Sequence, residues 1–100
     1  MSMTVVVTRN VSNRMRGFLS SSLLELAPGV YSAPRISPAV RERIWSVLND
    51  WFNLENEASV VMVWADSTSP CGQSVLTLGS PPIEIVSIDG LLTTRCAANL

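Results

Sequence analysis

Apolar residues recur along the chain with two different periods, which predict strands and helices in turn. Residues 3–8 contain three consecutive valines, a β-branched run typical of a strand buried on both faces or lying in the centre of a sheet. Between residues 15 and 26 the apolar positions recur at helical spacing, and Ser12 stands where it can cap that helix. We expect Pro28 and Gly29 to end the helix.

A second helix is predicted after a short extended piece at residues 30–32. Ser37 supplies a capping hydroxyl, and Pro38 follows at the first helical position, where its missing N–H is not needed. The apolar positions of this helix again share one face: Val40, Ile44, Val47, Leu48 and Trp51.

The second half of the chain predicts strands. Residues 60–65 form another buried apolar run, and residues 74–78 make a suitable partner, so we expect a hairpin. Glycine and proline interrupt the chain at residues 79–82. Beyond them we expect a C-terminal strand at about residues 83–95, with a tight turn signal at Asp89-Gly90, that reaches outward for dimerisation or docking.

This order of elements favours a single α+β domain over residues 1–100. We expect a ferredoxin-like fold, with one mainly antiparallel sheet and both helices packed on one of its faces. The other face of the sheet would then be apolar and uncovered in a monomer. Because 47% of the residues are hydrophobic, we expect a homodimer that forms through the sheet and buries this face.

The composition also sets expectations for location and cofactors. No apolar run approaches the roughly 18 to 20 residues that a membrane-spanning helix needs, and the N-terminus lacks the basic-then-apolar order of a signal peptide. We therefore expect a cytoplasmic protein with no membrane partner. Cys71 and Cys96 have no metal-ligand spacing and are interpreted as free thiols. We expect no structural metal or other cofactor.

Charge is distributed very unevenly. Six of the seven arginines lie in the first 43 residues, which carry a net charge of +4, whereas the remaining residues carry −5. The chain contains no lysine, and the planar guanidinium group suits two-pronged contacts to phosphate oxygens. Nucleic acid is the polyanion that this pattern suggests. Charge alone is equally consistent with a solvated face that pairs with acids of a neighbouring subunit.

The basic residues concentrate where the first predicted strand meets the first helix. Arg9 and Asn10 follow the strand, and Arg14 and Arg16 lie in the first turns of the helix. A helix N-terminus offers backbone N–H groups and the positive end of the helix dipole, which together favour a bound phosphate. Cations at that end are unfavourable without an anionic ligand, which favours phosphate binding over ordinary exposed first-turn residues.

The chain contains no histidine, which excludes the commonest general base and any histidine-dependent triad. A magnesium-dependent nuclease would instead need converging carboxylates, for which Asp66, Glu84 and Asp89 are candidates. Their spacing specifies no known site, and loops and turns often contain such acids. The tryptophans lie on predicted core stripes and are interpreted as core or dimer contacts: Trp45, Trp51 and Trp64.

Spaced blocks of sequence carry a family resemblance, and they occupy residues 1–11, 14–17, 24–31, 40–45, 60–65 and 88–90. They include TVVVTRNV in the first block, Arg14-x-Arg16-Gly17 in the second and Ile88-Asp89-Gly90 in the last. In this order they resemble Cas2, the small spacer-acquisition subunit among CRISPR-associated proteins, type I-E subgroup. The resemblance spans nearly the whole chain.

The resemblance implies a ferredoxin-like homodimer that bridges two dimers of the CRISPR integrase Cas1. It implies that the homodimer holds the duplex part of captured foreign DNA while the integrase performs the joining chemistry. By position, Asn10, Arg14 and Arg16 would contact the DNA backbone and read phosphate instead of sequence. The C-terminal strand would dock on the integrase through residues that include Ile88, Leu91, Leu92 and Thr94.

Two departures from the family pattern change these expectations. A second basic pair after the fourth strand is replaced by uncharged residues 79–82, so duplex binding would depend more on the first helix, with Arg9 and Arg35. The wider family is often described as metal-dependent endonucleases with an acidic residue at the end of the first strand, where Arg9 stands here. A cation there opposes a magnesium ion, so we expect a non-catalytic role. The alternative is a magnesium nuclease acting on RNA or DNA through Asp66 or Asp89.

Overall fold

The computed structural model describes residues 2–52, 57–79, 83–88 and 91–96. The elements follow in the order β1 (Ser2–Arg9), α1 (Asn13–Ser22), β2 (Leu24–Ala27), β3 (Val30–Ile36), α2 (Pro38–Phe52), β4 (Ser59–Ala65), β5 (Gln73–Gly79), β6 (Ile83–Ile88) and β7 (Leu91–Cys96). Among the described residues, no helix is both long and apolar enough to cross a membrane.

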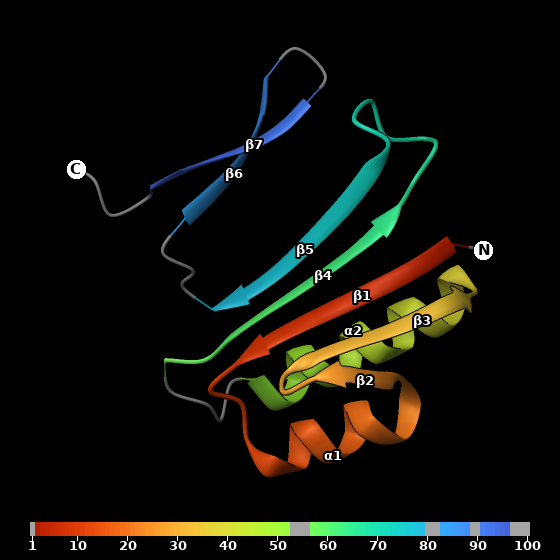
Figure 1. The fold of residues 1–100 in the computed structure, drawn as a ribbon, viewed down its shortest axis with the longest axis vertical. Helices are drawn as coiled ribbons and strands as arrows, with labels where there is room; N and C mark the ends of the chain where they lie inside the picture. The colour runs from red at the N-terminus through yellow and green to blue at the C-terminus, as the bar shows by residue number, and fades with distance from the viewer. Residues whose placement is uncertain (1, 53–56, 80–82, 89–90, 97–100) are drawn as a thin grey trace.

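Five strands form one sheet in the order β2-β3-β1-β4-β5, and every neighbouring pair is antiparallel (Figure 1). The two helices connect β1 to β2 and β3 to β4. The strand order 2-3-1-4 with these helical crossovers is ferredoxin-like, and β5 extends the sheet beside β4. The predicted α+β class, antiparallel sheet and helix pair are confirmed.

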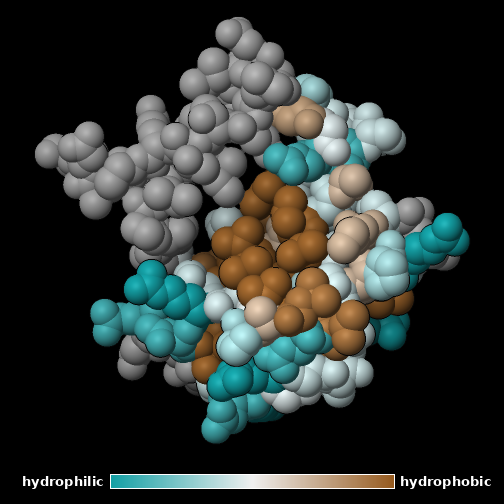
Figure 2. All heavy atoms as spheres, viewed as in Figure 1, coloured by the Kyte–Doolittle hydropathy of each residue, from teal (hydrophilic) through white to brown (hydrophobic). Residues whose placement is uncertain are grey.

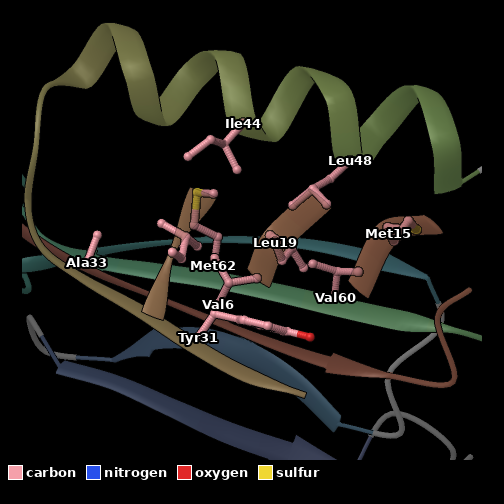
Figure 3. Close-up of a cluster of buried hydrophobic side chains, with 10 residues drawn as sticks. Val6, Met15, Leu19, Tyr31, Ala33, Ile44, Leu48, Val60 and Met62 are labelled. Atoms are coloured by element: carbon pink, nitrogen blue, oxygen red, sulfur yellow. The ribbon is translucent and has the colours of Figure 1, made fainter. Parts of the chain in front are cut away.

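The core lies between the helices and one face of the sheet. Val6, at the centre of β1, is opposite Tyr31 on β3 and Met62 on β4, and all three side chains are fully buried. Leu19 from α1 and Leu48 from α2 meet them from the helical layer (Figure 3). Both helices therefore cover the same sheet face, because the buried residues of each belong to one hydrophobic cluster.

Alternate residues of the central strands point to the other face of the sheet. Val5 pairs with Val63, and Val63 pairs with Val75, so these valines form a row across β1, β4 and β5. Val7 on the same face is 43% exposed. Figure 2, viewed as in Figure 1, shows the resulting apolar patch across the centre of the sheet. The expectation of an apolar sheet face that the helices leave uncovered is confirmed.

Both helices begin where the sequence indicates. The Ser12 hydroxyl accepts a hydrogen bond from the Met15 backbone N–H at 3.2 Å, and the Ser37 hydroxyl accepts one from the Val40 N–H at 3.2 Å. Side-chain caps of this kind satisfy N–H groups that the first helical turn leaves unpaired. Each cap fixes the point at which the chain leaves a strand and enters a helix.

The prediction that the first helix continues to Leu26 is wrong. Helix α1 ends at Ser22, and residues 24–27 form β2, in which Leu24 pairs with Ser32 of β3. Three consecutive serines at the end of α1 lower its helical propensity, and pairing with β3 supplies the backbone hydrogen bonds instead. The extended piece predicted at residues 30–32 is correspondingly longer, since β3 runs to Ile36.

The hairpin predicted for residues 60–65 and 74–78 is confirmed as the antiparallel pair β4 and β5. Residues 83–95, predicted as a C-terminal strand, form two strands, β6 and β7, that pair antiparallel as a separate sheet. The predicted tight turn at Asp89-Gly90 lies outside the described residues.

Candidate nucleic-acid interface

The junction between β1 and α1 brings the predicted basic residues to one end of the sheet. Arg9 is the last residue of β1, and Asn10 adopts the left-handed conformation, with φ 57°, that turns the chain toward the helix. Asparagine tolerates this conformation better than most residues. Arg14 and Arg16 then follow in the first turns of α1. All four of these side chains are exposed.

The helix holds its two arginines toward solvent because its apolar side is fixed in the core. Met15 and Leu19 are fully buried against the sheet. Arg14 and Arg16 flank Met15 in the sequence, so the helical rotation carries both away from the core. They lie at the positive end of the α1 dipole, and the first turn contains no acidic residue. Within the described parts of the chain, neither arginine forms an ion pair.

Arg14 has an aromatic support. Its guanidinium carbon lies 4.0 Å from the ring centroid of Trp51, near the C-terminal end of α2. Phe18 contacts Trp51 edge to face, with ring centroids 5.4 Å apart and ring planes at 68°. Both rings pack against the hydrophobic core. The guanidinium of Arg14 therefore rests on a platform that the core holds in place.

Arg16 lies at the rim of a hollow of about 300 Å³. The other residues around the hollow come from the end of β1 and from the turn between β2 and β3: Thr8, Asn10, Val11, Pro28 and Gly29. The Gly29 carbonyl accepts hydrogen bonds from the Thr8 backbone N–H at 2.7 Å and from the Thr8 hydroxyl at 3.1 Å. These bonds join the turn to β1 and close one wall of the hollow.

Arg35 does not join this cluster. It lies near the end of β3, whose last residue, Ile36, pairs with Ser2 at the start of β1. Arg9 lies at the opposite end of the same strand, and a strand of this length spans roughly 20 Å. Arg9, Asn10, Arg14 and Arg16 thus lie at the same end of β1, and a nucleic-acid role for Arg35 stays a separate prediction.

A second arginine stacks on a tryptophan at the other end of α2. The guanidinium carbon of Arg41 lies 4.1 Å from the ring centroid of Trp64. Hollows of about 670 Å³ and 260 Å³ adjoin this pair. Sequence reasoning missed both stacks, because each arginine is far along the chain from its tryptophan and no local spacing connects them.

Asp66, the first candidate for a metal-dependent site, is hydrogen-bonded within the loop between β4 and β5. Its carboxylate accepts hydrogen bonds from the Thr68 N–H at 2.9 Å, the Thr68 hydroxyl at 2.6 Å and the Ser74 hydroxyl at 2.7 Å. These bonds, first those of the Thr68 and Ser74 hydroxyls, lower the pKa of Asp66 below its ordinary value of 3.8, and the charge of Arg41 adds to the effect. Asp66 therefore acts as a turn residue, as its loop position suggested.

The other candidate acids, Glu84 and Asp89, lie in the C-terminal part of the chain. Within residues 2–52 and 57–79, whose side chains the structure describes, no group of three or more potential metal ligands comes together. Glu84 lies on β6 opposite Arg95 on β7. Asp89 lies outside the described residues.

The residues expected to dock a partner lie on the C-terminal hairpin. Ile88 on β6 pairs with Leu91 on β7, and Leu92 and Thr94 follow on β7 opposite Ser87 and Ile85. This hairpin is separate from the five-stranded sheet in hydrogen bonding. Its role in docking stays a prediction.

Comparison with known protein families gives a match over most of the chain. Residues 3–92 match the model of a family described as CRISPR-associated protein (Cas_Cas2CT1978). The matched region includes the whole five-stranded sheet except Ser2, both helices and the basic cluster of β1 and α1.

Proposed function

The chain belongs to this Cas2-like family of CRISPR-associated proteins, and from that premise we propose that it is a DNA-binding structural subunit of the spacer-acquisition complex, of the type I-E subgroup. As a homodimer it bridges dimers of the CRISPR integrase Cas1 and holds the duplex of the captured foreign DNA. It contributes no chemistry of its own to the joining reaction.

The observation that carries this proposal is the basic cluster of Arg9, Asn10, Arg14 and Arg16. All four side chains are exposed where β1 ends and α1 begins, and the two helical arginines extend from the positive end of α1. A bound phosphate compensates cations that otherwise face an unfavourable helix dipole. Guanidinium contacts to phosphate oxygens bind any duplex sequence, which suits a subunit that receives foreign DNA.

Dimerisation through the open face of the sheet would bury the valines on it. Val5, Val61 and Val63 are half-buried in the single chain, and Val7 is more exposed. Valine rows on two sheets can interdigitate at the usual spacing of about 10 Å. Apposed faces would bring two basic clusters into one particle, which gives a duplex two attachment points.

The C-terminal hairpin is the segment we assign to the integrase. Its two strands pair with each other and not with β5, which leaves the edge strands of this small sheet as sites for strand addition by a partner. The contact would involve the residues predicted from the family resemblance, including Leu92 and Thr94.

The nuclease alternative has less support. A magnesium site at the end of β1 would contain Arg9, whose charge repels the metal. Asp66 already accepts three hydrogen bonds within its own loop. Magnesium-dependent cleavage that disappears in an Asp66→Asn or Asp89→Asn variant would reverse this ranking.

A double substitution tests the proposed function. We expect Arg14→Ala with Arg16→Ala to weaken binding of a fluorescently labelled duplex about tenfold or more, measured by anisotropy on the chain reconstituted with its integrase. Arg43→Ala, which removes an exposed arginine on α2 outside the basic cluster, is the control and should leave affinity nearly unchanged. Unchanged affinity in the double variant, with a wild-type circular dichroism spectrum, would overturn the proposal.

A further inference from the structure

We infer that Trp51 is a positioning residue for the phosphate contact of Arg14, an inference that rests on the function proposed above. The stack of Arg14 on Trp51, at 4.0 Å, joins the start of α1 to the end of α2. These two residues lie far apart in the sequence, so the contact forms only when the helices pack.

The geometry leaves the binding edge of the guanidinium open. A guanidinium that stacks on an aromatic face makes the contact with its flat side, whereas its N–H groups point outward in the plane of the group. Those in-plane N–H groups are the ones that grip two phosphate oxygens at once. Stacking on Trp51 therefore fixes the plane of Arg14 and does not consume the donors that a phosphate needs.

The platform is rigid because it is tied to the core. Trp51 packs against the buried cluster and is also contacted edge to face by Phe18 from α1. Arg14 and Phe18 lie four residues apart on α1, so the helix presents both to the same indole. An arginine held in this way loses less conformational freedom on binding than one that moves freely in solvent.

Arg16 provides the contrast. It lines the hollow beside Gly29, and in the described residues no aromatic ring stacks on it. Its contribution to binding would come mainly from charge. Arg16→Lys should therefore retain most of the affinity for DNA, whereas Arg14→Lys should lose part of it, because an ammonium group cannot make the same planar contact.

The direct test replaces the platform and keeps the arginine. We expect Trp51→Leu to weaken binding of the labelled duplex by about two- to tenfold, and Trp51→Phe to recover part of that loss. Trp64→Leu is the matched control, since it removes the same side chain from the equivalent stack on Arg41. It should leave duplex affinity within about twofold of wild type.

A double-mutant cycle separates positioning from general loss of packing. In an Arg14→Ala background, Trp51→Leu should have no further effect on affinity, because the residue that it positions is gone. An equal loss in both backgrounds, or an equal loss from Trp64→Leu, would overturn the inference. If the Arg14→Ala, Arg16→Ala double variant leaves affinity unchanged, the proposed function fails. If the double variant weakens binding but Trp51→Leu leaves affinity unchanged, this inference fails alone.

A measurement without DNA guards against a variant that does not fold. Proton NMR of the wild-type chain should show the Arg14 side-chain methylene signals shifted upfield by the indole ring current. Those shifts should decrease in Trp51→Phe, which keeps a ring and a core contact. Methylene signals at ordinary arginine positions in the wild type would contradict the stacked arrangement on which the inference depends.

Discussion

Gly29 joins the turn between β2 and β3 to the end of β1, and replacing it with alanine tests how closely these segments are packed. Gly29 has a φ of +81°, and a Cβ atom placed on it would lie 2.8 Å from the Thr8 carbonyl oxygen. That separation is shorter than a carbon and an oxygen normally allow, and the obstacle is backbone. The substitution must therefore shift the turn. This shift would disturb the hydrogen bond of 2.7 Å from the Thr8 backbone N–H to the Gly29 carbonyl oxygen.

The expected cost has two parts. An alanine in the left-handed conformation is destabilised by roughly 1 to 2 kcal/mol. Forcing an extra carbon into a packed contact adds about 1 to 3 kcal/mol. We therefore expect Gly29→Ala to lower the free energy of unfolding by about 2 to 5 kcal/mol, a large fraction of the stability of a domain of this size.

Substitutions at two other glycines separate the conformational cost from the steric cost. Gly72 has a similar φ of +77° but nothing within 4 Å of an added Cβ, so Gly72→Ala should show only the conformational cost, about 1 to 2 kcal/mol. Gly17 lies within α1 and also has open space around it, so Gly17→Ala should stabilise the chain by about 0.5 to 1 kcal/mol.

Urea denaturation followed by circular dichroism measures the free energy of unfolding of all three variants. The protein concentration must be kept the same throughout, since association contributes to apparent stability. The reasoning is refuted if Gly29→Ala costs no more than Gly72→Ala, because the contact with Thr8 would then add nothing.

Three further predictions concern the core, the open sheet face and the loop after β4. Leu48→Ala, which truncates a fully buried side chain of α2, should lower the free energy of unfolding by about 2 to 5 kcal/mol in the same denaturation assay; a loss below 1 kcal/mol would contradict the core described here. Val63→Asp places a charge in the middle of the valine row and should convert a dimer to a monomer in sedimentation velocity, whereas a persistent dimer would exclude this face as the interface. An NMR titration should give Asp66 a pKa below 3.8; the stabilisation from its hydrogen bonds is then complete above that ordinary value and is lost as the pH falls through the lowered pKa. A value above 3.8 would show that the loop does not hold this carboxylate in its ionised form.

The elements with strong local signals could be predicted from the sequence. The valine run of β1 predicts a central strand, and β1 lies between β3 and β4 in the sheet. The Ser37-Pro38 start of α2 is confirmed by the Ser37 cap. In both cases the local preference and the tertiary packing favour the same structure.

The end of α1 could not be predicted, because a long-range interaction decides it. Leu23 and Leu26 continue the helical spacing of apolar residues. Leu23 is buried, as that spacing suggests, whereas Leu26 is 58% exposed on β2. Hydrogen bonding of β2 to β3 outweighs the local periodicity, and this pairing depends on the turn at Gly29.

The candidate site could be predicted only in part, because it combines residues that are close in the sequence with a contact between distant residues. Arg9, Asn10, Arg14 and Arg16 are close in the sequence, so their position where one strand meets one helix could be predicted. The support that Trp51 gives to Arg14 joins two helices and has no sequence signal. Contacts of this kind become visible only after the helices are placed on the sheet.

The salt dependence of duplex binding tests the central claim most directly. For the chain reconstituted with its integrase, the slope of log affinity against log salt concentration should become less steep by about two when Arg14 and Arg16 are both replaced by alanine, since each phosphate contact contributes about one. An identical slope in the wild type and the double variant, with both proteins folded and bound to the integrase, would show that the DNA is held by a different surface.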